Sequence, residues 1–158
     1  MKKTALFILV FYLFSCKPTK PFSENYQVQC VSTSTDALYK VEISFQSSDP
    51  NPNLELFKLN AIDAILFRGL TGGKECITQK PMLTINKSEA RLNSFFKELY
   101  GNKSAYNKYI SAVEKTNDQL LQEKNRLYNH VCIVSVNKDL LRKDLITANL
   151  LKPLNAGF

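Results

Sequence analysis

Histidine is scarce in this chain of 158 residues, and His130 is the only one. A Ser–His–Asp or Cys–His catalytic site needs such a base, but His130 lies in a strand-like segment where a structural role is the better interpretation. The sequence also lacks a C-x-x-C pair and any cluster of metal-ligand side chains, which argues against a redox motif or a zinc site. We therefore expect no enzyme, catalytic residue, cofactor or metal; a hydrolase with an unusual site is the weakest alternative.

Long apolar runs are missing from the sequence except at its N-terminus. There, Lys2 and Lys3 precede an unbroken apolar run from Ala5 to Phe14. This run has about ten residues, whereas a membrane-spanning helix needs about 20. A short basic segment followed by such a run is typical of an export signal, so residues 1–15 are predicted to be a cleaved signal peptide.

The tetrapeptide that closes this run, Leu13-Phe14-Ser15-Cys16, resembles the lipobox of bacterial lipoproteins. The resemblance implies that Cys16 becomes the N-terminus and carries acyl chains such as palmitate. Stable anchoring needs more than one chain, and bacterial lipoproteins carry enough of them. An unmodified, buried cysteine is the alternative.

Residues 16–25 are polar and contain prolines, so they are predicted to form a tether between the lipidated cysteine and a domain. Lys17 is not the aspartate that retains many lipoproteins in the inner membrane, which implies the outer membrane. No acidic cluster follows the cysteine, unlike in many surface-exported lipoproteins. We therefore expect a domain that faces the periplasm.

The composition fits one globular domain over residues 26–158. The formal net charge is +7, but the lysines are scattered, and such a distribution mainly gives solubility. Nucleic acid is not expected as a partner of an exported protein; anionic lipid headgroups or acidic polymers are the alternatives.

Three cysteines follow Cys16, namely Cys30, Cys76 and Cys132, and they allow at most one disulfide. Cys30 and Cys132 lie in strand-like segments and are expected to be small buried side chains. A bond between these two is the less favoured alternative.

Alternation of apolar and polar residues predicts two strands over 26–33 and 38–45, joined by a turn into a hairpin. Residues 127–136 predict a third strand that is largely apolar on both faces, as expected of a central strand covered on two sides.

Helical spacing predicts three helices, over 54–69, 86–101 and 138–149. The second is expected to turn four apolar side chains inward: Leu92, Phe95, Phe96 and Leu99. Residues 103–115 fit a helix or a strand equally well, and 116–126 predict an exposed loop or a frayed helical turn. The sum is an α+β fold with a small, mostly antiparallel sheet of about 3–4 strands packed by about three helices.

A few side chains are candidates for function. Asp63 is the one carboxylate in the apolar part of the first helix; an exposed stripe with Glu55 and Lys58 is favoured over a buried acid. Residues 71–74 (Thr-Gly-Gly-Lys) lack the first glycine and the strand of a phosphate-binding loop.

Two further groups of side chains have a functional and a structural interpretation. A basic cluster on the last helix is interpreted as a solvated face: Lys138, Arg142 and Lys143. Several tyrosines fit a recognition surface about as well as ordinary packing: Tyr100, Tyr106, Tyr109 and Tyr128.

Residues 59–70 and 134–145, together with the ending 154–158, resemble a family of uncharacterised lipoproteins of the Bacteroidota. In that family a helix of the form A-x-x-A-[IV]-x-F-[KR]-G follows a strand, and a late V-x-V-N strand runs into a closing helix. The arrangement is distantly similar to the N-terminal domain of the flagellar assembly protein T group, at the level of fold alone. Neither resemblance implies catalytic residues.

These observations favour a non-enzymatic, membrane-anchored lipoprotein that acts as an interaction or assembly module and binds another protein of the cell envelope. A ligand- or glycan-binding accessory lipoprotein, using tyrosines and lysines, is the alternative.

Overall fold

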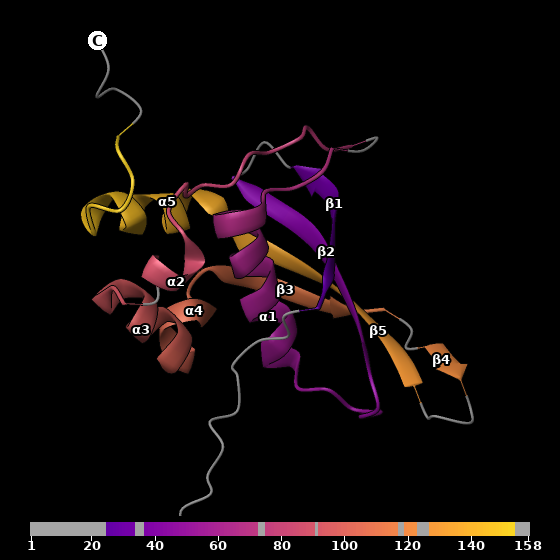
Figure 1. The fold of residues 1–158 in the computed structure, drawn as a ribbon. Coiled ribbons are helices and arrows are strands. Elements are labelled where there is room, and N and C mark those ends of the chain that lie inside the picture. The colour runs from indigo at the N-terminus through magenta and orange to yellow at the C-terminus, as the bar shows by residue number, and fades with distance from the viewer. Residues whose placement is uncertain are drawn as a thin grey trace, which may run out of the picture.

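The computed structural model describes residues 25–33, 37–72, 75–90, 92–116, 119–122 and 127–153; residues 1–15, Cys16 and most of the expected tether lie outside them. Its strands are β1 (Gln27–Thr33), β2 (Leu38–Ser47), β3 (Ile110–Lys115), β4 (Gln119–Gln122) and β5 (Leu127–Asn137). Its helices are α1 (Leu54–Asp63), continued by the π-helical turn η2 (Ala64–Arg68), α2 (Lys87–Ala90), α3 (Ser94–Gly101), α4 (Lys103–Asn107) and α5 (Lys138–Thr147) (Figure 1). The fold is α+β, as the sequence predicts.

The strands form one antiparallel sheet with β5 at its centre. One edge of β5 pairs with β2 over nearly its whole length, and the other edge pairs first with β4 and then with β3. β1 pairs with the outer edge of β2, which confirms the predicted hairpin. The predicted strand at 127–136 is confirmed as β5.

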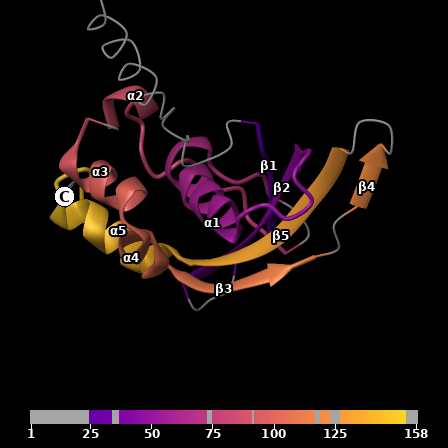
Figure 2. The ribbon, with the colours of Figure 1, turned by 90° about the horizontal axis from the view of Figure 1, so that it is seen from below.

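Helix α1 lies in the concave side of the curved sheet, with α3, α4 and α5 grouped beside it where β5 runs into α5 (Figure 2). The alternating side chains of β2 and β5 on this side are buried: Val41, Ile43, Phe45, Cys132, Val134 and Val136. Phe57 of α1 packs on Phe45 with ring centroids 4.7 Å apart. The hydrophobic core therefore lies between the sheet and α1.

The opposite face of the sheet corrects one expectation. Val131 and Ile133 of β5 point to this face and are half-buried. Ile133 lies opposite Glu42 of β2 and Glu114 of β3 in the ladder. In the described part of the chain the helices lie on one side of the sheet, so β5 is central without the predicted cover on both faces.

The predicted helix over 54–69 is confirmed, with a wider last turn and a stop at Gly69. Gly69 has φ +75°, and a Cβ there would lie 2.4 Å from the Gln79 carbonyl oxygen, so only glycine fits. The chain then folds back over the helix end, where the backbone nitrogens of Met82 and Leu83 donate to the carbonyls of Ile65 and Leu66. These bonds satisfy carbonyls that a helix end leaves open.

The predicted helix over 86–101 is two helices, so that prediction is wrong in its middle. The side chain of Asn93 accepts a hydrogen bond from the backbone nitrogen of Phe95 at 2.9 Å and starts α3 anew. Asparagine stabilises a helix start better than a helix interior. Leu92 consequently lies outside the helices and is 75% exposed, whereas Phe96 and Leu99 are buried.

The ambiguous segment 103–115 contains both structures that were considered, because α4 ends at Asn107 and β3 begins at Ile110. The prediction of loop or helical turn over 116–126 is wrong for β4, which pairs Gln119 with Asn129 and Leu120 with Tyr128. β4 lacks apolar alternation, so its strand structure comes from pairing with the edge of β5.

The closing helix is confirmed as α5. Asn137 caps it through a hydrogen bond from the Leu140 backbone nitrogen at 2.9 Å. Leu141 and Leu145 are fully buried on the helix face that meets the core.

A disulfide joins Cys30 of β1 to Cys76, which corrects the expectation that Cys30 is a buried thiol. The alternative Cys30–Cys132 pair is also wrong. Cys30 lies opposite Val41, whereas Cys132 lies opposite Ile43, so β2 separates the two cysteines. Cys132 is a buried thiol of the core, as expected.

Candidate functional site

His130 is fully buried on the helix-covered face of β5, beside Phe45 and Tyr128. Its Nε2 lies 2.9 Å from the backbone carbonyl oxygen of Asp49, to which it donates. This bond ties the loop after β2 to the core. The position agrees with the structural role expected for this histidine.

Asp63 is fully buried, so the expectation of an exposed stripe with Glu55 and Lys58 is wrong. The hydroxyl of Tyr26 donates to its Oδ2 at 2.7 Å, and Lys87 Nζ lies 2.5 Å from its Oδ1. Glu55 and Lys58 form their own pair at 3.0 Å. A buried carboxylate needs such partners. The sequence could not show them, because Tyr26 directly precedes β1 and Lys87 begins α2, both far from Asp63 along the chain.

Tyr26 joins this carboxylate to a second cation. The Arg68 guanidinium lies 3.8 Å from the centre of the Tyr26 ring, and its Nη1 donates to the Tyr26 carbonyl oxygen at 3.0 Å. Burial, followed by the charge and hydrogen bond of Asp63, raises the pKa of Tyr26 far above its ordinary value. Asp63, Tyr26, Lys87 and Arg68 form what we call the α1 cluster.

Asn60 lies on α1 one turn before Asp63 and is also fully buried. Neither polar atom of its side-chain amide has a hydrogen-bond partner among the described residues. Such a group loses its hydration without replacement. The Asn60 amide thus differs from the neighbouring Asp63 carboxylate, which has both Tyr26 and Lys87 as partners.

Of the two interpretations left open for the tyrosines, packing is the one that fits the structure. Tyr106 and Tyr109 are buried, and their hydroxyls donate to Glu55 at 2.5 Å and to Asp144 at 2.8 Å. Tyr100 stacks on Phe96 in α3, while Tyr128 stacks on His130 in β5. These side chains serve packing and helix–helix links.

The two hydroxyl–carboxylate hydrogen bonds join α4 to α1 and Tyr109 to α5, and ion pairs support both carboxylates. Glu55 also binds Lys58 and Lys103, and Lys108 binds Asp144 at 2.7 Å. Burial raises the pKa of Tyr109 to about 12, with the Asp144 hydrogen bond as the next cause. The phenols are therefore neutral donors at physiological pH.

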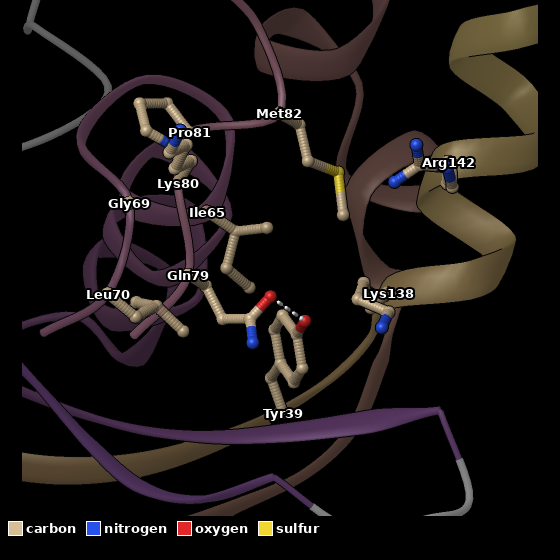
Figure 3. A pocket seen from close by; sticks show the side chains of 10 residues that line it. All are labelled: Tyr39, Ile65, Gly69, Leu70, Gln79, Lys80, Pro81, Met82, Lys138 and Arg142. Atoms are coloured by element: carbon tan, nitrogen blue, oxygen red, sulfur yellow. Dashed lines mark hydrogen bonds between the residues drawn. The ribbon is translucent and has the colours of Figure 1, made fainter. Parts of the chain in front are cut away.

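A small cavity of about 240 Å³ opens between α5, β2 and the segment that follows α1 (Figure 3). We call it the basic pocket; its walls are Tyr39, Ile65, Gly69, Leu70, Gln79, Lys80, Pro81, Met82, Lys138 and Arg142. Three of these side chains are cations and none is a carboxylate. The remaining walls are mostly apolar, which is typical of a ligand site.

Two of the cations come from one face of α5, since Lys138 and Arg142 are one turn apart. Lys138 Nζ lies 4.7 Å from the centre of the Tyr39 ring, and its contact with Asp139 is 3.9 Å long. Arg142 Nε is buried and has no hydrogen-bond partner in the described part of the chain. The interpretation of this cluster as a solvated face holds for Lys143, which is exposed, and not for the two pocket residues.

The opposite wall of the basic pocket is rigidly placed. The Tyr39 hydroxyl donates to Gln79 Oε1 at 2.7 Å. Leu70 and Gln79 exchange both backbone hydrogen bonds, at 2.8 and 2.9 Å. The disulfide at Cys76 ties the loop between them to β1. No sequence pattern predicts this wall; the basic cluster on α5, across the cavity, is the part of the pocket that the sequence showed.

A wider groove of about 870 Å³ lies where β1 begins and β2 ends. Amides and a hydroxyl contribute much of its lining, including Asn25, Gln27, Gln46, Asn129 and Ser44. Its one charged side chain is Arg68, which already binds the Tyr26 carbonyl. The basic pocket is therefore the more specific site.

Residues 71–74 are described only at Thr71 and Gly72, where the Gly72 nitrogen donates to the Thr78 hydroxyl at 3.1 Å. Among the described residues there is no group of three or more His, Cys, Asp or Glu side chains that could hold a metal ion. Within that same part of the chain, no helix has the length and apolar character needed to cross a membrane.

Comparison with protein-family models, curated proteins and solved structures finds no match to this chain.

Proposed function

We propose that this protein is an exported bacterial lipoprotein anchored through Cys16. Residues 1–15 act as the signal, Cys16 carries the acyl chains, and residues 16–25 hold the domain off an outer membrane that it faces from the periplasm. The observation that carries the proposal is the sequence Leu13-Phe14-Ser15-Cys16 at the end of a basic and then apolar segment.

The Cys30–Cys76 disulfide supports export from a separate part of the chain. Disulfides persist in oxidising compartments such as the periplasm and are rare in the cytosol. The disulfide is thus compatible with the destination that the signal implies.

The domain acts, in this proposal, as a non-enzymatic interaction or assembly module for another envelope protein. Support comes from the buried carboxylate Asp63, which is held by Tyr26 and Lys87 and so has its charge balanced within the fold. Asp144 is held in the same manner by Tyr109 and Lys108. Groups engaged in this way stabilise a fold, whereas a catalytic pair would converge on a substrate pocket.

Lipidation can be tested with an alkyne-labelled fatty acid fed to the native host, followed by fractionation and mass spectrometry. We expect label on Cys16 of the wild-type chain in the outer-membrane fraction. Cys16→Ser should lose both the label and the membrane fraction, whereas Cys132→Ala is the matched control that keeps both. Label retained in the Cys16→Ser variant would overturn the proposal.

The interaction role has a separate test. Mild solubilisation of native membranes and native gels should show the protein in a stoichiometric complex with an envelope protein. Deletion of the gene should alter that complex. An intact complex after deletion, with the wild-type protein running alone, would refute the assembly role.

A ligand-binding accessory lipoprotein is the second candidate, and the basic pocket specifically favours it. The pocket has cationic side chains without a carboxylate in its walls, and apolar surface beside them.

A further inference from the structure

We infer that the basic pocket binds the oxyanion group of a small ligand, a phosphate ester or a carboxylate with a short apolar body. The inference rests on the second candidate function, ligand binding, and assigns its site and ligand class. Lys138 and Arg142 bind the oxyanion, and the apolar walls contact the rest of the ligand.

The positive charge of the pocket favours the binding of an anion. Lys138 and Arg142 lie one turn apart on α5, and like charges at this spacing repel each other. No carboxylate lines the cavity, and the nearest acid contact, Asp139 to Lys138, is 3.9 Å long with an Asp139 side chain that is 64% exposed. An oxyanion between the two cations would remove this imbalance.

The hydrogen-bond donors of the pocket are also incompletely used. Arg142 Nε is buried without a hydrogen-bond partner among the described residues. A guanidinium is suited to carboxylates and phosphates because its planar donors match two oxygens at once. Figure 3 shows Arg142 reaching from α5 toward the cavity opposite Met82.

Tyr39 does not compete for the same ligand atoms. Its hydroxyl donates to Gln79 Oε1 at 2.7 Å, and its ring lies beneath Lys138 Nζ at 4.7 Å. The ring therefore helps to hold the ammonium group in place through a cation–π contact. Tyr39 is a positioning residue in this site.

The size and walls of the cavity limit the ligand. About 240 Å³ is below the range of about 300–1,000 Å³ that is usual for drug-sized ligands, so a short molecule fits. Ile65, Leu70 and Met82 supply apolar contacts beside the cations. The wall is fixed in advance by the hydrogen bonds of Met82 and Gln79 to the end of α1 and to Leu70, which lowers the cost of binding.

The test is titration calorimetry on the full chain in a neutral detergent, with inorganic phosphate, glycerol 3-phosphate and butyrate as probes. We expect saturable binding of at least one probe with a Kd of about 1 mM or lower. Arg142→Met should weaken it at least about tenfold, Arg142→Lys should restore part of it, and Tyr39→Phe should have a smaller effect.

Lys143→Met is the matched control, because it removes the same charge from the exposed side of α5. Equal weakening by Lys143→Met and Arg142→Met would overturn the inference, since it would show attraction by net charge alone. Absence of saturable binding in a folded wild-type chain, with no pull-down of the Cys16→Ser chain on phosphatidylglycerol vesicles, would also overturn it.

A vesicle arm identifies the source of the oxyanion. If the Cys16→Ser chain binds phosphatidylglycerol vesicles but not phosphatidylcholine vesicles, and if Arg142→Met weakens this binding, the ligand is a lipid headgroup. Binding of the soluble probes assigns a free molecule.

The Cys16→Ser chain also separates the two proposals. If it binds the probes, the pocket functions without lipidation; if the probes fail while fatty-acid label is found on Cys16, the anchor stands and the pocket inference falls.

Discussion

The α1 cluster and the basic pocket differ in how the charges of their side chains are balanced. In the α1 cluster a fully buried carboxylate, Asp63, is met by Tyr26 at 2.7 Å and Lys87 at 2.5 Å. In the basic pocket Lys138 and Arg142 lie together with no carboxylate in the walls. In the α1 cluster the negative charge of Asp63 is balanced within the fold, and the cluster stabilises the fold. The walls of the basic pocket are instead held by the disulfide and by backbone hydrogen bonds, so its cations can bind a ligand.

The largest expected effect concerns the covalent link beside the pocket. Cys30→Ser should lower the free energy of unfolding by about 2–5 kcal/mol, because the disulfide closes a long loop over a sequence separation of 46 residues. Denaturant unfolding measures it. The double variant Cys30→Ser/Cys76→Ser should match the single one and be insensitive to reductant; a wild-type chain equally insensitive to reductant would contradict the prediction.

In the α1 cluster, Asp63→Asn should cost about 2–3 kcal/mol, because it removes a charged acceptor that Tyr26 and Lys87 share. Lys87 is partly exposed and can turn to water, which keeps the cost below that of a fully buried orphan charge. The control Glu89→Gln removes an exposed carboxylate and should change stability by less than about 0.5 kcal/mol. Equal effects of the two variants would remove the distinction between the regions.

A substitution of Asn60, in the same region, is expected to raise the free energy of unfolding instead of lowering it. Asn60→Leu should raise the free energy of unfolding by about 1 kcal/mol, since a buried amide without hydrogen-bond partners is replaced by an apolar side chain of similar size. Thermal and denaturant unfolding of this variant, compared with Asn60→Asp, measure the effect. A clear loss of stability in Asn60→Leu would show that the amide has a partner in solution.

Acid should weaken the contacts that Glu55 and Asp144 make with neighbouring elements. The pKa of Glu55 is lowered: burial by itself would raise it, but hydrogen bonds from Tyr106, Lys58 and Lys103 outweigh burial. The pKa of Asp144 is lowered in the same way by Lys108 and Tyr109. Lowered carboxyl pKa values stabilise the fold above the ordinary values of 4.5 and 3.8, and this stability is lost as the pH falls below them.

The effect is expected to be about 1 kcal/mol or less for each carboxylate, as for other partly exposed ion pairs. Denaturant unfolding between about pH 6 and about pH 3 measures it. Glu55→Gln should flatten the pH dependence. A slope identical to that of the wild type would exclude Glu55 as a source.

The smallest expected effect on stability is that of Arg142→Met. It should change the free energy of unfolding by less than about 0.5 kcal/mol or increase it slightly, because it relieves repulsion with Lys138 and removes a buried donor without a hydrogen-bond partner. A loss comparable to that of Asp63→Asn would make Arg142 a structural residue and remove the contrast between the regions.

Sequence patterns predicted the elements that bury one regular face. β2 and β5 alternate strictly enough to set their register, and α5 has a capping asparagine before helically spaced leucines. They failed in the middle of residues 86–101, because Asn93 starts a helix within an apolar spacing, and at β4, which takes its structure from the edge of β5. Local residue types do not report such tertiary partners.

The two sites were harder to predict than the fold. The prediction of an exposed Asp63 was wrong because its partners Tyr26 and Lys87 lie far from it in the sequence. The basic pocket combines β2, the end of α1, the following loop and α5, so the sequence showed only the basic cluster on α5, which was interpreted as a solvated face. Cys76 could not be paired from sequence because three cysteines allow several connectivities.

The position of Cys30 has a mechanical consequence for a chain tethered at its N-terminal end. Tension on that end loads β1 at Gln27, where antiparallel pairing with β2 can peel open one residue at a time. After Val28 and Gln29 the load reaches Cys30 and passes through its sulfur to Cys76, and from there to the loop beside Leu70 and Gln79. In the proposed lipoprotein, the crosslink would therefore protect the remainder of the sheet from separation by a pull on the N-terminal anchor.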